Sequence, residues 1–308
     1  MKLIVQPDAG ITPVVTAIKR AKKAIDIMIF RLDRTEISRA LEGAVARGVA
    51  VRALIAHMNS GGVRTLRKLE LRLLEQGVSV TRTADDLVRY HGKMIIIDHR
   101  TLHVYGFNFT GLDIERSRSF GLMTKNQNLV QDAIRLFEAD VARQPYLPSS
   151  DRLIVSPETA RERIADFIKG ARRQLLIYDP KVSDPAMVRL LTERAAKGVD
   201  VRIIGRLAAK KAPLTAQKYP GKRLHVRAIV RDGRQAFVGS QSLRRIELEQ
   251  RREVGIIASE PKVVKQIHGI FEQDWALTEA GKKAARKAGK KRKRGAKASA
   301  RPIAASDR

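Results

Sequence analysis

The chain of 308 residues contains no cysteine, and this absence excludes several kinds of site. Without cysteine there is no disulfide, no thiol nucleophile, no iron–sulfur cluster and no zinc site with thiolate ligands. The lack of cysteine also fits a reducing compartment. Any covalent mechanism in this protein must therefore use another nucleophile.

Long hydrophobic runs are missing as well. No stretch approaches the ~18–20 apolar residues that a membrane-spanning helix needs. The N-terminal segment MKLIVQPDAG has an apolar run of only three residues, which is too short for a secretory signal. Hydrophobic residues still make up 44% of the chain, enough to build a core and to exclude wholesale disorder. We therefore expect a soluble protein in the cytoplasm.

Acidic residues are few compared with basic ones. The chain has 61 Lys and Arg against 32 Asp and Glu, a formal net charge of +29. Such an excess favours anionic partners such as nucleic acid, anionic lipid surfaces and phosphorylated substrates. It also leaves room for a peripheral location on an anionic membrane or on the nucleoid.

The C-terminal residues 281–308 carry much of this charge, with 12 Lys and Arg and one Asp. They contain no aromatic residue and cannot bury a core, so we expect a disordered basic tail. Such a tail either is simply solvated or attaches the protein to nucleic acid or to an anionic membrane. The body that precedes the tail keeps a net charge of +18 and is therefore basic on its own.

Two segments of the chain occur twice. Residues 46–52 (ARGVAVR) reappear 150 positions later as residues 196–202 (AKGVDVR). Residues 91–98 (HGKMIIID) match residues 225–232 (HVRAIVRD) at a spacing of 134. Two copies at this spacing predict a duplicated domain of roughly 140 residues rather than a solenoid.

Strands alternate with helices in each copy. Helical spacing of apolar residues predicts helices over residues 13–23, 36–47 and 129–141. Apolar runs predict strands over residues 25–30, 49–55, 94–97 and 102–105. The alternation predicts the α/β fold class, with sheets covered by helices. A segment rich in structure breakers, residues 143–150, predicts domains at residues 1–145 and 146–280, followed by the tail at 281–308.

The pattern His-x-Lys/Arg-x4-Asp occurs once in each copy. The two sets are His91, Lys93 and Asp98, and His225, Arg227 and Asp232. Residues two apart on a strand share a face, so each histidine lies beside a cation. A neighbouring cation lowers the pKa of an imidazole and is costly in a core unless an anion lies between them. The pattern therefore predicts a phosphate site.

These motifs resemble those of the phospholipase D superfamily, in which His-x-Lys-x4-Asp is followed after six residues by Gly-Ser-x-Asn. The corresponding segments here are residues 105–108 (YGFN) and 239–242 (GSQS), and the Phe-x-x-Asp pattern at 137–140 and 271–274 also resembles the family. The resemblance covers residues 1 to about 276. It implies two repeated phospholipase D-like α/β/α sandwich domains, related by a pseudo-two-fold axis that brings both motifs to one cleft.

The resemblance also implies a phosphodiesterase that needs no metal and no other cofactor. In such enzymes one histidine attacks phosphorus and forms a phosphohistidine, while the other protonates the leaving oxygen and then activates water or an alcohol. On this basis His91 is the expected nucleophile and His225 the expected general acid and base. A neutral imidazole is a competent nucleophile near pH 7.

Several residues are expected to support this chemistry. Negative charge that builds on the phosphoryl oxygens needs cations and hydrogen-bond donors. Candidates are Lys93, Arg227, Asn108, Ser240 and Ser242. Asp98 and Asp232 follow the cations by five residues, and we expect them to be structural anchors rather than proton-transfer groups.

A buried acid is expected beside one histidine. The resemblance places Glu253, 28 residues after His225, as the acid that holds the imidazole of His225, whereas the same position after His91 is Ser119. A carboxylate raises the pKa of a histidine more than a hydroxyl does, which favours His225 as the acid. Asp113 or Glu115 could instead reach His91.

The chain also departs from the family pattern. Arg227 stands for a lysine, Ser119 for an acid, and Tyr105, Gly106 and Ser242 for motif residues. Three hypotheses therefore stay open. The first is a phospholipase D-type hydrolase or phosphatidyltransferase that acts on phospholipid. The second is an endonuclease of the same superfamily that acts on DNA or RNA, and the third is a catalytically weak binder of nucleic acid or anionic membrane. A monomer suffices for the site in each case, because one chain carries both motifs.

Overall fold

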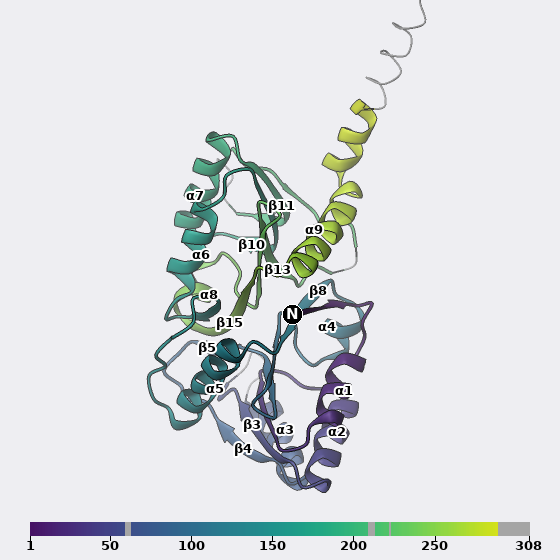
Figure 1. Ribbon diagram of the computed structural model, residues 1–308, viewed down its shortest axis with the longest axis vertical. Helices are drawn as coiled ribbons and strands as arrows, with labels where there is room; N and C mark the ends of the chain where they lie inside the picture. Colours follow the sequence, from purple (N-terminus) through teal and green to yellow (C-terminus); the bar gives the residue numbers. More distant parts are fainter. Residues whose placement is uncertain (59–62, 209–212, 222, 289–308) are drawn as a thin grey trace, which may run out of the picture.

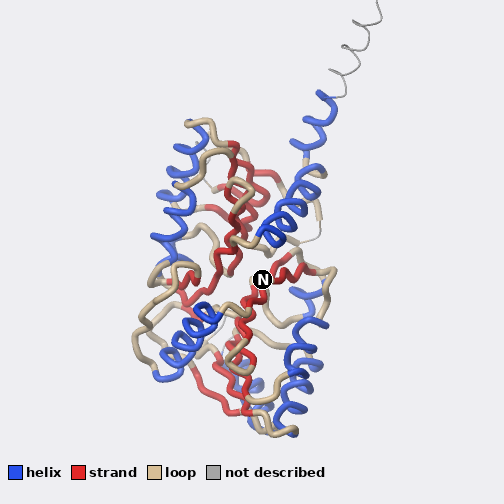
Figure 2. Tube along the Cα trace, in the orientation of Figure 1, coloured by secondary structure: helices blue, strands red, loops and turns tan. Residues whose placement is uncertain are grey.

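The structure is a computed structural model that describes residues 1–58, 63–208, 213–221 and 223–288. Two sheets, one from each copy of the repeat, follow each other along the long axis of the molecule (Figure 1). Helices flank the strands of both sheets (Figure 2).

The first copy forms a seven-stranded sheet. In spatial order its strands are β1 (Lys2–Gln6), β8 (Ser119–Thr124), β7 (Thr101–Tyr105), β6 (Met94–Ile97), β2 (Ala24–Ile29), β3 (Ala50–Ile55) and β4 (Ser79–Arg82). β2, β3 and β4 pair in parallel, and the other neighbours are antiparallel. The helices of this copy are α1 (Thr12–Arg20), α2 (Thr35–Ala46), α3 (Val63–Glu75), α4 (Gly111–Glu115) and α5 (Gln127–Ala142).

The second copy repeats this arrangement. Its strands lie in the order β9 (Leu153–Ser156), β15 (Arg251–Ala258), β14 (Gln235–Gly239), β13 (Arg227–Arg231), β10 (Gln174–Val182), β11 (Asp200–Leu207) and β12 (Ala216–Gln217). Its helices are α6 (Ala160–Lys169), α7 (Pro185–Ala196), α8 (Arg245–Glu249) and α9 (Pro261–Ala276). The predicted duplicated α/β architecture is therefore confirmed, because strand order and strand direction agree between the copies.

One short strand leaves its own copy. β5 (Arg89–Tyr90) pairs in parallel with β15 of the second sheet, with Tyr90 opposite Arg252. The equivalent bridge in the other direction joins Leu224 to Arg118, next to β8 of the first sheet. Both crossing pairs keep the spacing of 134 seen in the sequence. Each copy therefore pairs one short segment with the other copy, and the two pairings are equivalent, as a pseudo-two-fold relation requires.

The alternation of side chains in the strands builds separate cores. In β2 the residues Ile25, Ile27 and Ile29 face the core beneath α1, α2 and α3, whereas Met28 faces the other side. This alternation follows from the two-residue period of a strand. The second copy has an equivalent outer core beneath α6 and α7. Each sheet is thereby buried on both faces.

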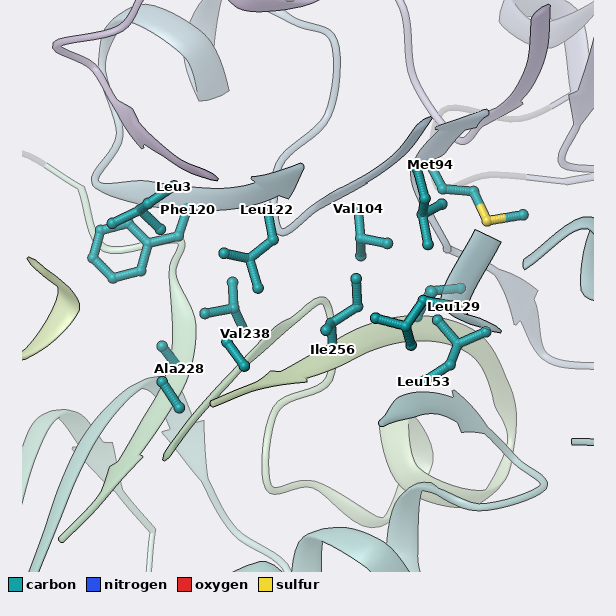
Figure 3. Packing of buried hydrophobic residues seen from close by; sticks show 14 of the residues in the cluster. Leu3, Met94, Val104, Phe120, Leu122, Leu129, Leu153, Ala228, Val238 and Ile256 are labelled. Atoms are coloured by element: carbon teal, nitrogen blue, oxygen red, sulfur yellow. The ribbon is translucent and has the colours of Figure 1, made fainter. Parts of the chain in front are cut away.

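The inner faces of the two sheets share one hydrophobic core. Leu122 and Val104 of the first copy lie opposite Val238 and Ile256 of the second (Figure 3). Apolar side chains of α5 and α9 complete this core. Because the interface is apolar and continuous, the copies are held in one arrangement, and that arrangement positions the residues of the site.

The boundaries of the predicted elements hold to within a few residues, with one informative difference. α1 ends at Arg20 rather than at residue 23. The backbone N–H groups of Lys22, Lys23 and Ala24 donate instead to the carboxylate of Asp98, at 2.7–3.1 Å. This contact stops the helix and starts β2.

The predicted tail is partly corrected. Residues 279–288 are helical and extend away from the body beyond α9 (Figure 1). The prediction of disorder from residue 281 onward is therefore wrong for residues 281–288, where the alanine and lysine content supports a helix. Residues 289–308 lie outside the described residues. In the described part of the chain, no helix is long and apolar enough to cross a membrane.

Candidate active site

Each motif histidine is held by the opposite copy. His91 follows β5, and its backbone N–H donates to the carbonyl of Arg252 at 2.7 Å. The backbone N–H of His225 donates to the carbonyl of Arg118 at 3.0 Å. The exchange brings both motifs to the interface between the copies, so one chain supplies the complete pair of histidines.

His91 lies in a buried cluster of polar side chains. Its Nδ1 is 2.8 Å from Oε2 of Glu253, which is fully buried on β15. The Nζ of Lys93, also fully buried, lies 2.9 Å from both ring nitrogens. A carboxylate that accepts from Nδ1 selects the tautomer with its lone pair on Nε2. This arrangement suits His91 to nucleophilic attack through Nε2.

The prediction that Glu253 holds the imidazole of His225 is wrong. The position of Glu253, 28 residues after His225, predicts contact with His225 of the same copy, whereas in the structure Glu253 contacts His91. The reason is the exchange of strands, because β15 lies beside residues 89–91 and not beside the segment that precedes His225. The reason given for His225 as the acid, a carboxylate from Glu253, therefore falls away.

His225 has a different acidic neighbour. Its Nδ1 is 3.6 Å from Oδ2 of Asp113, which lies on α4 of the first copy. Asp113 was considered as a partner for His91 and instead faces the other histidine. Ser119, which occupies the place of Glu253 in the first copy, is buried, and its Oγ has no hydrogen-bond partner among the described residues.

Burial and neighbouring cations keep both imidazoles neutral. Burial lowers the pKa of His91 well below its ordinary value, and the charges of Lys93 and Arg227 lower it further. Burial also lowers the pKa of His225, and again Arg227 and Lys93 add to the effect. Each histidine is therefore within electrostatic range of the cation from the opposite copy. The two motifs form one site rather than two.

The two cations differ in their own surroundings. Burial lowers the pKa of Lys93 to about 7. Arg227 donates from Nη1 to the carbonyl of His225 at 2.9 Å and from Nε to Ser242 Oγ at 3.3 Å, and it lies 4.0 Å from Glu247. Arginine keeps its charge at any accessible pH. Only the lysine can therefore lose its charge near neutral pH.

Of the three predicted phosphate-binding side chains, two lie in the site and one lies within the sheet. Asn108 donates from its backbone N–H and from Nδ2 to Oδ2 of Asp113, at 2.8 and 2.7 Å. Ser242 shares its hydroxyl with Arg227. The hydroxyl of Ser240 instead accepts from the backbone N–H of Val254 at 3.1 Å and lies within the sheet. Asn108 and Ser242 thus lie in the site, while Ser240 supports β15 next to Glu253.

Asp98 and Asp232 lie away from the histidines. Each adopts a positive φ, of 52° and 54°, in the turn after its strand. Asp232 accepts backbone hydrogen bonds from residues 172–174 at 2.7–3.2 Å, as Asp98 does from residues 22–24. Both aspartates therefore tie the start of the central strand to the end of the motif strand.

Sequence reasoning missed two ion pairs that join the copies. Arg252, next to Glu253, lies 3.0 Å from Asp140 of α5. Arg118, next to Ser119, lies 3.3 Å from Asp274 of α9. Both aspartates end the Phe-x-x-Asp segments, and both arginines keep the spacing of 134. The spacing of 134 could have revealed these pairs in the sequence, since it marks Arg118 and Arg252 as equivalent positions.

The site offers no cluster of metal ligands. Among the described residues, no group of three or more His, Asp or Glu side chains is arranged to hold a metal ion. The two acids nearest the histidines, Glu253 and Asp113, each lie at an Nδ1 atom, while Lys93 and Arg227 supply the positive charge that suits an anion.

Comparison with known proteins identifies the family of the chain. A family model described as "Cardiolipin synthase, PLD-like domain" matches residues 14–141 and 164–275. The chain therefore belongs to this family of phospholipase D-like domains, and the resemblance noted in the sequence is confirmed. No curated protein matches the chain.

The solved structures that share the fold include a kinase and a synthase. Polyphosphate kinase from Porphyromonas gingivalis superposes with a TM-score of 0.74 at 20% identity, covering 88% of this chain and 46% of that one. This chain thus spans less than half of the kinase. Phosphatidylserine synthase from Haemophilus influenzae Rd KW20 superposes with a TM-score of 0.65 at 12% identity, covering 90% of this chain and 85% of that one. At these identities the likeness is one of fold.

Proposed function

We propose that the protein is a phospholipase D-type phosphodiesterase that cleaves or transfers the phosphatidyl group of phospholipids through a phosphohistidine on His91. The family match to cardiolipin synthase-like domains supports a lipid substrate. The basic body of the chain suits a peripheral location at an anionic membrane. The reaction needs no metal, because the protein's own groups supply the nucleophile, the acid and the charge stabilisation.

In the first step Nε2 of His91 attacks phosphorus, and the bond from phosphorus to the leaving alcohol breaks. Lys93 and Arg227 stabilise the charge that develops on the non-bridging oxygens. His225 gives its proton to the leaving oxygen. The negative charge of the bound phosphodiester and of Asp113 favours the protonated imidazole that this step requires.

In the second step water or an alcohol attacks the phosphohistidine. His225, now neutral, accepts the proton of the attacking hydroxyl, and the phosphorus–nitrogen bond to His91 breaks. Glu253 holds Nδ1 of His91 throughout, so the imidazole is released as the same tautomer. Hydrolysis and transfer differ only in the attacking hydroxyl.

The observation that carries this proposal is the convergence of two differently supported histidines with two cations. Glu253 holds the Nδ1 of His91 at 2.8 Å, and Asp113 lies 3.6 Å from the Nδ1 of His225. A site that only binds an anion has no need of a buried carboxylate behind one imidazole, because the carboxylate weakens anion binding. The arrangement is what a nucleophile and a proton donor require.

The direct test is release of head groups from phospholipid vesicles in the presence of EDTA. Wild type is compared with His91→Ala and with His268→Ala, a half-buried histidine on α9 outside the site. We expect activity that resists EDTA in wild type and His268→Ala and that is absent in His91→Ala. No release by the wild type would remove the lipid proposal.

A nuclease is the second candidate, and the net charge of the body favours it. The part of the chain before the tail carries +18, and phosphate contacts dominate the affinity of proteins for nucleic acid. An oligonucleotide digest in EDTA, with the same three proteins, tests this candidate. Cleavage of the oligonucleotide without head-group release would make the protein a nuclease. Failure of both assays would favour a binder.

A further inference from the structure

Three buried side chains beside the histidines differ in type between the copies. The residues that correspond at the spacing of 134 are Lys93 and Arg227, Asn108 and Ser242, and Asp113 and Glu247. All six are buried. In the second copy the cation is longer, the neutral side chain is shorter and the acid is longer than in the first. The two motifs therefore bring different sets of side chains to one site.

The two acids occupy equivalent places. Asp113 lies on α4 and Glu247 on α8, and each of these helices has five residues. Oδ2 of Asp113 accepts the backbone N–H of Asn108 at 2.8 Å, and Oε2 of Glu247 accepts that of Ser242 at 2.7 Å. Each carboxylate thus holds the loop that follows β7 or β14.

The groups that approach these acids are different. In the first copy Nδ2 of Asn108 donates to the same oxygen of Asp113 at 2.7 Å. In the second copy Ser242 has no amide, and the approaching group is Nε of Arg227. This Nε donates to Ser242 Oγ at 3.3 Å and lies 4.0 Å from Oε2 of Glu247. The guanidinium of the second copy therefore takes the place of the amide of the first.

Arg227 is also held at a second point. Its Nη1 donates to the carbonyl of His225 at 2.9 Å, whereas its Nη2 has no hydrogen-bond partner in the described part of the chain. Two directed contacts fix the plane of a guanidinium, so the second copy itself sets the orientation of Arg227. Lys93 differs, since its Nζ lies 2.9 Å from both ring nitrogens of His91 and is oriented by that histidine.

Glu247 lies among several cations and within electrostatic range of the nucleophile. Its Oε1 accepts from Nη1 of Arg244 at 3.1 Å and from Nη1 of Arg251 at 3.3 Å. Burial and nearby cations lower the pKa of His91, and the charge of Glu247 opposes them. Because Arg227 is the cation that Glu247 shares with the motif, the carboxylate acts on the reaction through Arg227.

We propose that Glu247 is the positioning residue of Arg227, and that Arg227, Ser242 and Glu247 form one interdependent unit that replaces the lysine, asparagine and aspartate of the first copy. The inference rests on the proposed function, in which Arg227 stabilises the charge on the phosphoryl oxygens. Ser242 and Glu247 hold Nε, and Nη2 is left to donate to a phosphoryl oxygen.

The interdependence follows from the reach of each side chain. A lysine at 227 has no nitrogen at the level of Nε, so it leaves Ser242 and Glu247 without this donor. An asparagine at 242 brings an amide to the acid, as Asn108 does, and competes with Arg227. An aspartate at 247 is one methylene shorter and withdraws from a contact that is already at 4.0 Å. The three changes suit one another, whereas each alone is unfavourable.

The test changes the unit in steps and measures cleavage of bis(p-nitrophenyl) phosphate, a phosphodiester without lipid. Glu247→Asp should lower kcat of the wild type about tenfold, the effect of a weakened charge-assisted contact. KM should change less, because the charge on the phosphoryl oxygens grows in the transition state. In the variant Arg227→Lys with Ser242→Asn, the same substitution should instead raise kcat. The triple variant should then lie within about threefold of the wild type.

The reversal of sign distinguishes positioning from a structural role. If Glu247 only holds α8 in place, Glu247→Asp lowers kcat in both backgrounds, and this result would overturn the proposal. A triple variant whose loss equals the product of the separate losses would overturn it as well. Glu249→Asp is the matched control, since Glu249 lies on the same helix and pairs with the exposed Arg245 at 2.9 Å. We expect no change in this control, and urea denaturation shows whether each variant is folded.

A binding experiment separates this inference from the proposed function. Release of p-nitrophenolate without release of head groups would contradict the lipid substrate and leave the test of the unit intact. If the wild type cleaves neither substrate, the proposed function fails, and calorimetric titration with inorganic phosphate decides the inference. Glu247→Asp should then weaken phosphate binding in the wild type and strengthen it in the variant with Arg227→Lys and Ser242→Asn. Weakening in both backgrounds, or no phosphate binding by the wild type, would overturn the unit.

Discussion

The two histidines of the site occupy equivalent backbone positions and have different partners. His91 has the buried carboxylate of Glu253 at 2.8 Å from Nδ1. At the position equivalent to Glu253, the copy that faces His225 has Ser119, and the nearest acid to Nδ1 of His225 is Asp113 at 3.6 Å. A duplicated fold has thus kept its geometry while its two histidines acquired different environments. The difference teaches that duplication brought two equivalent histidines to one site, while substitutions around them gave each a different acidic neighbour.

The largest expected effect is on activity, and it should differ between His91→Ala and His225→Ala because the two histidines act at different steps. With bis(p-nitrophenyl) phosphate, whose leaving group needs no proton, His91→Ala should lose activity by about 10⁴-fold or more. His225→Ala should still release a burst of one p-nitrophenolate per protein, because only the second step needs its base. Rapid-quench kinetics measures this burst. A burst in His91→Ala and none in His225→Ala would reverse the two roles.

The next effect concerns the acids behind the imidazoles. Glu253→Gln should lower kcat by roughly 10²–10⁴-fold, because the amide no longer stabilises the Nδ1–H tautomer and the positive charge that forms on His91. Ser119→Ala at the equivalent position should change kcat by less than about threefold, since the hydroxyl carries no charge. Steady-state assays of both variants suffice. Equal losses would show that the asymmetry between the copies has no catalytic meaning.

A smaller effect is expected from the ion pairs that join the copies. Arg252 is almost fully buried against Asp140, while Arg118 is more exposed against Asp274. Asp140→Asn should lower the free energy of unfolding by about 1–3 kcal/mol, because a buried guanidinium loses one of its acids while Glu158 remains at 2.5 Å.

Asp274→Asn should cost less, since Arg118 is less buried than Arg252 and its guanidinium can be solvated when the charge of Asp274 is lost. Urea denaturation measures both values. Because Arg252 adjoins Glu253, we also expect kcat to fall more in Asp140→Asn than in Asp274→Asn. The opposite ranking would mean that the more exposed pair aligns the copies.

The smallest effect is a difference in pH dependence between the two cations. Burial lowers the pKa of Lys93 to about 7. Its ammonium is therefore charged below that pH and is lost as the pH rises through it, so kcat/KM should fall on the alkaline side. Lys93→Arg should remove this alkaline decline, because arginine stays charged. A decline that persists unchanged in the variant would assign it to another group.

Much of the fold could be predicted from the sequence. Two segments that recur, at shifts of 150 and 134 along the chain, establish that the domain is duplicated. The apolar alternation of β2 predicts a buried strand without knowledge of its neighbours. The spacing of His91 and Lys93 places their side chains on one face, since the period of a strand is local. These features are carried by residues near one another in the chain.

Other features could not be predicted, because they depend on where the copies meet. Glu253 lies 162 positions from His91, and no periodicity tells which of two equivalent histidines it faces. The exchange of residues 89–91 and 223–225 between the copies decides this pairing. The pairing of Asp140 with Arg252 depends on the same exchange.

Two equivalent strand ends also have different surroundings for this reason. Phe30, Ala56 and Tyr90 form an apolar cluster in the first copy, whereas Arg206 and Arg223 line a cavity in the second. Phe30 and Arg206 look like ordinary residues at the ends of strands. Only the tertiary structure packs Phe30 against Tyr90 and places Arg206 near Arg223. Arg206 has no acidic partner there among the described residues. The sequence by itself determined the repeat, the strands and the residue types of the two motifs, because these are local properties of the chain. The tertiary structure decided which residue serves which histidine, because that choice depends on packing between segments far apart in the sequence.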